Sequence, residues 1–244
     1  MTNKLKYFIG NWKMFGDFGS FKIINKVNQF KKKIILCVPN TLIHFFKKKL
    51  KSKFISLGVQ NCHYHQGYGP FTGSVNASML KKAGAEFVIL GHSENRSEGE
   101  TNQLIKKKIE SAINEKLSVI FCIGEALKEK KRGKTFSILK KQIKSSLEKK
   151  FNVNKIIFAY EPVWSIGTNK IPKMNELKST IKFIKNEFKK TFKTKKSPKV
   201  LYGGSVNDKN ISLFSSISEI DGFLIGGASQ SSKKFIDIVK NYYK

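Results

Sequence analysis

Short apolar runs recur along the chain, and the longer segments between them repeat their apolar residues every three or four positions. The short runs are typical of buried strands, and the longer segments are typical of amphipathic helices. Strands are predicted at 6–12, 34–38, 55–59, 87–90, 119–123, 156–160, 200–202 and 222–225. Helices with lysine-rich outer faces are predicted at 18–30, 101–116, 135–150, 175–192 and 231–242.

Strands that alternate with helices form a parallel sheet, because each helix carries the chain back to the start of the next strand. Eight such repeats in ~250 residues match a closed (β/α)8 barrel. We therefore predict that residues 1–244 form a single TIM-barrel domain with eight parallel strands. A doubly wound open sheet is the alternative, but the glycine fingerprint expected after its first strand is missing from residues 9–13.

The composition is that of a globular chain, with 40% hydrophobic and 12% aromatic residues. No segment approaches the ~20 apolar residues of a membrane span. The first 13 residues also lack a signal peptide's apolar segment, so we expect a cytoplasmic protein without a membrane partner. Cys37, Cys62 and Cys122 are far apart and odd in number, which predicts reduced thiols. His63 and His65 have no third candidate ligand, so no metal site is predicted.

The formal net charge of +30 raises the question of nucleic-acid binding, since basic side chains neutralise phosphates. Only Arg96 and Arg132 are arginines, however, and no aromatic stacking platform accompanies the lysines. Lys, Asn, Ile and Phe are all abundant and all have A/T-rich codons, so mutational drift of solvated positions is the preferred explanation. We expect no specific nucleic-acid partner and leave weak, nonspecific polyanion binding open.

Active sites of such barrels lie in the loops after the strands. Residues suited to chemistry follow the predicted strands at Asn11, Lys13, His92, Glu94, Glu161, 203–205 and 226–227. Glu161 precedes Pro162, which fixes the backbone, and Gly167 marks a flexible tip, so residues 163–168 are predicted to move as a flap. A carboxylate shielded under a closed flap becomes a stronger base. Taken alone, this segment is better explained as a glutamate beside an ordinary loop.

The other strand ends suggest partners for this carboxylate. His92 precedes Ser93, where a helix is expected to begin, and the positive helix terminus favours a neutral imidazole. Asn11 and Lys13 lie one residue apart, which at strand spacing puts both side chains on the same side. Three glycine-bearing loops offer backbone N–H groups to a phosphate. The residues concerned are Gly167, Ser205, Gly226 and Gly227.

Five segments together resemble the triosephosphate isomerases, in family order and over essentially the whole chain. They are Asn11-Trp12-Lys13-Met14, Gly91-His92-Ser93-Glu94, 159–168, Tyr202-Gly203-Gly204-Ser205-Val206 and 221–229. The resemblance implies an isomerase of glycolysis and gluconeogenesis without cofactor or metal. It would interconvert dihydroxyacetone phosphate and D-glyceraldehyde 3-phosphate through an enediolate. A glutamate base with a neutral histidine is that family's known pattern.

The resemblance also implies residue roles. Glu161 would be the base and His92 the electrophile that polarises the carbonyl. Lys13 and Asn11 would stabilise the oxyanion, while Glu94 would position Lys13 or shuttle protons. The substrate-binding residues would be Asn11, Lys13, Gly167, Ser205, Gly226 and Gly227.

The loop from Asn61 to Thr72 resembles the family's interdigitating dimer loop, which implies a homodimer with Thr72 near Asn11 of the partner subunit. Such a contact would brace the first strand end. Two alternatives to this function are kept: another phosphosugar isomerase on the same barrel, and a repurposed basic barrel that binds polyanions.

Four positions depart from the family pattern. Asn169 replaces a glycine at the lid tip and would slow or stiffen closure, although asparagine tolerates left-handed geometry. Phe15 replaces a common asparagine. Ser74 and Asn95 replace a glutamate and an arginine that pair near the subunit contact, so neither charge loses its partner.

Overall fold

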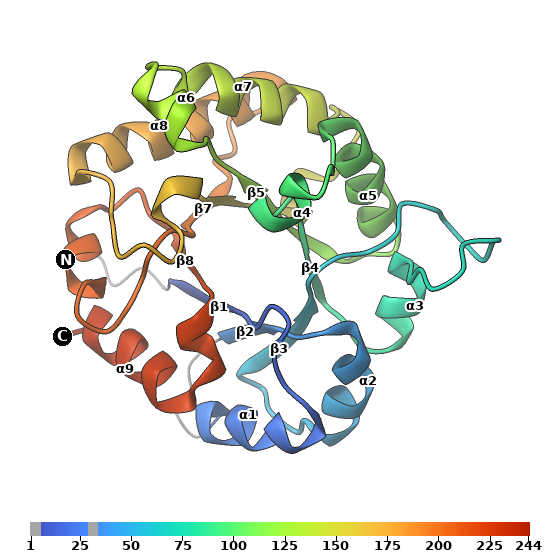
Figure 1. Ribbon diagram of the computed structural model, residues 1–244. Helices are drawn as coiled ribbons and strands as arrows, with labels where there is room; N and C mark the ends of the chain where they lie inside the picture. The colour runs from blue at the N-terminus through green and yellow to red at the C-terminus, as the bar shows by residue number, and fades with distance from the viewer. Residues whose placement is uncertain (1–5, 29–33) are drawn as a thin grey trace.

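The computed structural model describes residues 6–28 and 34–244, which form a closed barrel of parallel strands ringed by helices (Figure 1). Each strand pairs with the next along the chain, and β1 pairs with β8. The strands are β1 (Tyr7–Asn11), β2 (Ile34–Cys37), β3 (Ile55–Val59), β4 (Phe87–Leu90), β5 (Ser118–Ile123), β6 (Ile156–Tyr160), β7 (Lys199–Tyr202) and β8 (Gly222–Ile225). The predicted barrel is confirmed, and closure through β1 and β8 excludes the open sheet.

The longer helices ring the strands, whereas the short α4 (Ser93–Ser97) lies near the end of β4 (Figure 1). The other helices are α1 (Phe21–Asn28), α2 (Asn40–Lys49), α3 (Ala77–Lys82), α5 (Asn102–Asn114), α6 (Leu127–Lys131), α7 (Thr135–Ser146), α8 (Met174–Phe192) and α9 (Ser232–Tyr242). Short 3-10 turns are η1 (Phe18–Ser20), η2 (Val153–Lys155), η3 (Val163–Ser165), η4 (Ile211–Ser216) and η5 (Gly227–Gln230). Among the described residues, none of the helices is long and apolar enough to cross a membrane.

Two predicted helices differ from the observed ones by more than two residues at one end. The helix predicted at 18–30 begins as η1 and continues as α1, and its last two positions lie outside the described residues. The helix predicted at 135–150 ends at Ser146, because Leu147 is extended. Leu147 and Phe151 are both buried, so the chain leaves the helix in order to bury these side chains.

Apolar side chains on the two faces of each strand fill two separate layers. Along β5, Ile120 and Cys122 point into the barrel, whereas Val119, Phe121 and Ile123 pack beneath the helices. Burial on both faces explains why the strands read as continuous apolar runs. The barrel interior is a packed core, so the strands hold their C-terminal ends rigidly. The loops that follow these ends are the ones predicted to carry the site.

Candidate active site

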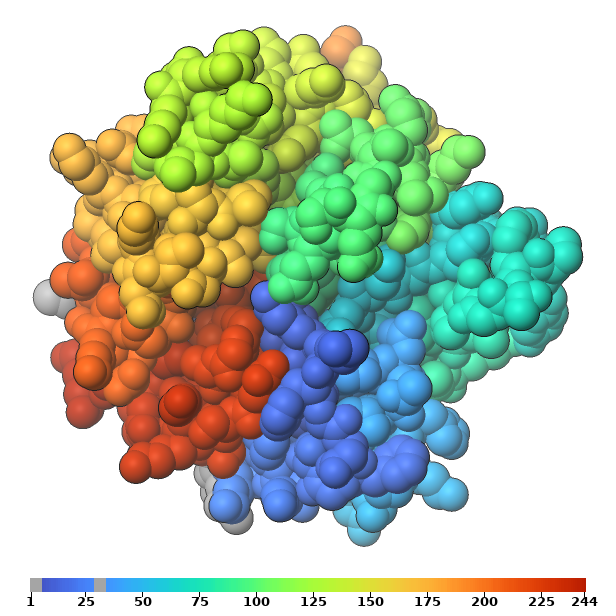
Figure 2. Space-filling model, in the orientation of Figure 1, coloured from blue at the N-terminus to red at the C-terminus, as the bar shows by residue number. Residues whose placement is uncertain are grey.

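A cavity of about 360 Å³ opens where the loops after β1, β4, β6, β7 and β8 meet. In Figure 2, surfaces of widely separated parts of the chain converge near the middle of the face shown. The predicted residues that line the cavity are Asn11, Lys13, His92, Glu161, Gly167, Ser205, Gly226 and Gly227. Glu94 lines an adjoining cavity of about 540 Å³ that also touches Asn11, Lys13 and His92.

Glu161 directly follows β6, and its side chain is only 3% exposed. Burial raises the pKa of the Glu161 carboxyl above its usual value, and this effect outweighs the opposing influence of His92 and Lys13. Glycines make the close packing feasible. A Cβ on Gly203 would lie 2.8 Å from Glu161 Cγ, and one on Gly124 would lie 1.8 Å from the main-chain oxygen of Glu161. The carboxylate is therefore held in a dry, narrow position as a strengthened base.

His92 caps the first turn of α4, as expected from its place before Ser93. Its Nδ1 accepts a hydrogen bond from the backbone N–H of Glu94 at 3.2 Å, so Nδ1 carries no proton. A neutral ring that accepts at Nδ1 carries its proton on Nε2, which lies 3.4 Å from Oε1 of Glu161. A carboxylate oxygen of Glu94 also lies 3.5 Å from Nδ1. The imidazole thus offers a hydrogen-bond donor beside the base.

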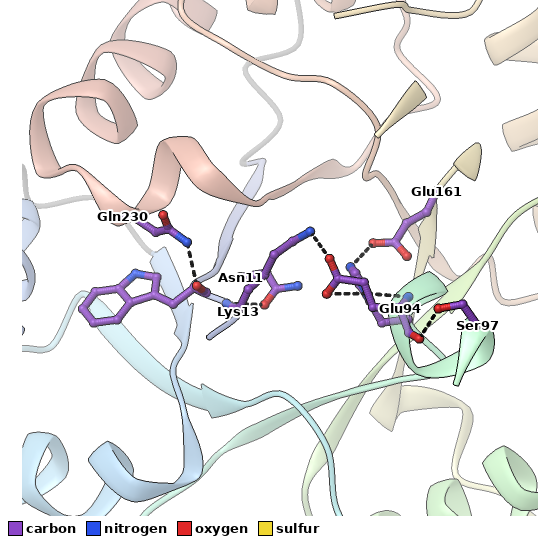
Figure 3. A network of polar contacts seen from close by, with 8 residues as sticks. Asn11, Lys13, Glu94, Ser97, Glu161 and Gln230 are labelled. Carbon is purple, nitrogen blue, oxygen red and sulfur yellow. Dashed lines mark hydrogen bonds and ion pairs between the residues drawn. The ribbon is translucent and has the colours of Figure 1, made fainter. Parts of the chain in front are cut away.

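Lys13 reaches the cavity by a route that strand spacing does not predict. β1 ends at Asn11, and Lys13 is left-handed with a φ of +56°. The prediction that strand spacing puts the Asn11 and Lys13 side chains on the same side is therefore wrong. The turn is closed instead by Asn11, whose Oδ1 accepts from the Lys13 backbone N–H at 3.1 Å. The Lys13 ammonium then lies 2.5 Å from Oε1 of Glu94 (Figure 3).

The opposite end of the cavity is built from glycines and hydroxyl groups. A Cβ on Gly204 would lie 2.2 Å from the Tyr202 hydroxyl and 2.6 Å from Ser165 Oγ, so only glycine fits there. Ser205 Oγ donates to the main-chain oxygen of Ser165 at 2.6 Å and accepts from the backbone N–H of Asn169 at 3.1 Å. Residues 165–169 are thereby attached to the loop after β7.

Comparison with known proteins adds an independent line of support. A family model described as triosephosphate isomerase matches residues 6–242. The triosephosphate isomerase of Dictyoglomus thermophilum is 41% identical, and the match covers 97% of this chain and 99% of the relative. That of Alkaliphilus oremlandii is 36% identical, with 94% and 96% covered.

A solved structure agrees with these relatives. The crystal structure of triosephosphate isomerase from Bartonella henselae has a TM-score of 0.90 at 34% identity, covering 98% of this chain and all of that one. The chain belongs to the triosephosphate isomerase family. It is an isomerase built on this family's eight-stranded barrel.

One contact of the lid in this triosephosphate isomerase family member was not predicted from the sequence. Glu125 is 1% exposed, and burial raises the pKa of its carboxyl. Its Oε1 accepts from Trp164 Nε1 at 3.0 Å and from the Tyr160 hydroxyl at 3.2 Å. Glu125 lies two residues after β5, and Glu161 lies directly after β6. The position of Glu125 after an apolar run could therefore have indicated it from the sequence. Trp164 lies in η3, so the contact anchors the first turn of the lid to β5 and β6.

The lid of this isomerase contains two left-handed residues. Gly167 has a φ of +69° and Asn169 a φ of +60°, so asparagine adopts the geometry that it was expected to tolerate. Within residues 6–28 and 34–244, no group of three or more His, Cys, Asp or Glu side chains is arranged to hold a metal ion.

Proposed function

We propose that the chain interconverts dihydroxyacetone phosphate and D-glyceraldehyde 3-phosphate without a cofactor or metal. The arrangement of Glu161 and His92 carries the proposal, because a buried carboxylate of raised pKa faces a neutral imidazole N–H across 3.4 Å. A base and an electrophile at that separation suit proton removal from a carbon beside a carbonyl. The match to the family favours this reaction over another phosphosugar isomerase or a polyanion-binding barrel.

In the proposed reaction, Glu161 takes a proton from the carbon next to the carbonyl. The C–H electron pair forms the carbon–carbon double bond of an enediolate, while the carbonyl electrons move onto oxygen. His92 Nε2–H donates to that oxygen and mediates the proton exchange between the two oxygens. Glu161 then returns its proton to the neighbouring carbon, so the reaction needs no outside reactant.

Lys13 and Asn11 are proposed to stabilise the negative charge of the enediolate, with Glu94 positioning the Lys13 ammonium. Support comes from the Lys13–Glu94 ion pair and from the hydrogen bond between Asn11 and the Lys13 backbone. A fixed ammonium in a site shielded from water stabilises developing charge more than a solvated one does.

Backbone N–H groups of four residues are proposed to bind the substrate phosphate. These are Gly167, Ser205, Gly226 and Gly227, which line the far end of the cavity. An enediolate beside a phosphate ester eliminates phosphate when it is free to rotate in water, so lid closure would protect the intermediate.

A coupled isomerase assay on the wild type and on Glu161→Gln tests the reaction. Glutamine keeps the size of the side chain but cannot take the proton, so kcat should fall by at least about 10²-fold. Wild-type activity no higher than that of the variant would contradict the proposal.

We also propose a homodimer formed through the loop from Asn61 to Thr72. Figure 1 shows this loop projecting beyond the ring of helices, and Phe71 within it contacts the rings of His63 and His65. The adjoining cavity is bordered by the fully exposed Met14, which suits coverage by a partner loop. Light scattering should give a dimer mass, and an active monomer at assay concentration would contradict the proposal.

The remaining proposals rest on the sequence and, for the pathways, on the family. Residues 1–244 would be a single domain that works in the cytoplasm, in glycolysis and gluconeogenesis. Its excess lysines would bind no specific nucleic acid.

A further inference from the structure

Gln230 connects two loops of the site that are far apart in sequence. It is the last residue of η5, and its Nε2 donates to the main-chain oxygen of Trp12 at 2.8 Å across 218 positions (Figure 3). Ser229, beside it, donates from its hydroxyl to the main-chain oxygen of Gly226 at 2.7 Å. The Gln230 contact therefore links the proposed phosphate loop to the turn that carries Lys13.

The hydrogen bond acts on the peptide unit that joins Trp12 to Lys13. The carbonyl of this unit accepts from Gln230, and its N–H donates to Oδ1 of Asn11 at 3.1 Å. Two side chains thus hold both polar groups of one peptide plane. The orientation of that plane relative to the Lys13 Cα sets the φ of Lys13.

The fixed orientation of the Trp12–Lys13 peptide matters for Lys13, because a φ of +56° is unfavourable for a lysine. Trp12 itself is fixed, since its backbone N–H donates to the oxygen of Cys37 at 3.0 Å and its buried indole packs edge-on against Phe46. With Trp12 fixed, the strain at Lys13 can relax by rotation about its N–Cα bond, which turns the side chain relative to the peptide that Gln230 and Asn11 hold.

Such a rotation would change the direction of the Lys13 side chain. Cε of Lys13 now passes 3.4 Å from the point that a Cβ on Gly226 would occupy, so the stem runs along the start of the phosphate loop. A negative φ would swing the stem away from Gly226 and the ammonium away from the cavity that both residues line.

We propose that Gln230 is a positioning residue that holds Lys13 in its left-handed conformation by donating to the Trp12 carbonyl. The inference rests on the proposed function, because it assumes that the Lys13 ammonium binds the anionic substrate. Gln230 touches no reacting atom in this scheme and acts only through the peptide before Lys13.

A four-protein affinity cycle tests the proposal, with 2-phosphoglycolate as the probe because its carboxylate mimics the charge of the enediolate. Its dissociation constant is measured by calorimetry for the wild type, Gln230→Met, Lys13→Met and the double variant. Gln230→Met should weaken binding about fivefold, as expected for loss of one hydrogen bond that holds a charged group. In the Lys13→Met background the same change should have no effect. Equal losses in both backgrounds, or none in the first, would overturn the proposal.

The cycle separates this inference from the proposed function. If Lys13→Met binds the probe as tightly as the wild type, the role of Lys13 is wrong whatever Gln230 does. Ser231→Ala is the matched structural control, since Ser231 Oγ caps α9 by accepting from the backbone N–H of Lys234. It should lower the melting temperature and leave the dissociation constant unchanged.

A second variant, Gln230→Glu, keeps the shape of the side chain and adds a pH signature. At pH 8 its carboxylate cannot donate to the Trp12 carbonyl, but the carboxyl that is protonated below its ordinary pKa of about 4.3 can. The affinity of the variant relative to the wild type should therefore rise about threefold between pH 8 and about pH 4. A flat ratio would show that donation to Trp12 does not position Lys13.

Discussion

At the level of single residues, the surroundings of Glu161 strengthen its carboxylate as the proposed base. Glu161 is enclosed by main chain that only glycine permits at positions 124 and 203, and this enclosure removes water from the carboxylate. Loss of water raises the pKa of the Glu161 carboxyl and strengthens it as a base. Loss of water also means that the charged form of Glu161 destabilises the folded protein.

This cost predicts how stability depends on pH. The folded-state pKa of Glu161 is raised, so its contribution is favourable below its unfolded pKa and is lost as pH rises through the folded value. At pH 8, Glu161→Gln should therefore melt at a higher temperature than the wild type. The expected rise is about 2–4 °C for each kcal/mol that the substitution adds to the free energy of unfolding. The difference should shrink as pH falls toward 4.5 in thermal melts. A variant less stable than the wild type at pH 8 would contradict a charged, desolvated Glu161.

Residues close to a strand end were predictable from the sequence, whereas residues that act across the fold were not. Glu161 and His92 stand directly after apolar runs, where this barrel places its site. Gln230 contacts Trp12 only because β8 closes against β1. The left-handed turn at Lys13 was also missed, since it depends on acceptance by Asn11 rather than on strand spacing.

At the scale of elements, the lid is attached at both ends. Trp164 at its start donates to Glu125, and the backbone of Asn169 at its end donates to Ser205. Between these anchors Ser165 is buried and accepts from Ser205, whereas Gly167 is exposed and left-handed. We propose that Gly167 supplies the conformational freedom that closure of the flap needs.

The left-handed backbone of Asn169 predicts that two substitutions at this position have different effects. Asn169→Ala should destabilise the left-handed conformation by about 1 kcal/mol, because alanine tolerates a φ of +60° less well than asparagine. We expect kcat/KM to fall about fivefold and the release of inorganic phosphate from substrate to increase. Asn169→Gly is the matched control and should stay close to the wild type. If the alanine variant behaves like the glycine variant, backbone geometry at Asn169 does not govern closure.

Strands were easier to predict than short helices. Each strand is a continuous apolar run because it is buried on both faces, and the predicted strands fall on the observed ones. The helices α3 and α6, of six and five residues, are too short for a periodic pattern to be recognised, and neither was predicted. α2 was also missed, since its three buried positions, Leu42, Ile43 and Phe46, precede a run of lysines.

At the scale of the whole molecule, charge is the most unusual property. The 47 basic residues outnumber the 17 acidic residues, so most lysines have no carboxylate to pair with. Like charges on a compact surface repel one another and destabilise the folded state.

This repulsion predicts a stabilising effect of salt. Raising ionic strength from 0.01 to 0.15 M shortens the Debye length from about 30 to 8 Å, which screens repulsion between distant lysines. Screening also weakens surface ion pairs, but each of these contributes only about 0–1 kcal/mol. The melting temperature should rise by several degrees with KCl, and sucrose of equal osmolality serves as the uncharged control. A melting temperature that falls with KCl would show that ion pairs outweigh repulsion.

Glu161 is proposed to move a proton between neighbouring carbons of a triose phosphate. Isomerisation of dihydroxyacetone phosphate in D2O, followed by proton NMR, tests it most directly. The wild type should form glyceraldehyde 3-phosphate that carries deuterium on the carbon next to the aldehyde, because the proton on Glu161 exchanges with solvent. Glu161→Gln should lose this incorporation together with turnover. Rapid isomerisation and unchanged deuterium incorporation in Glu161→Gln would contradict the account.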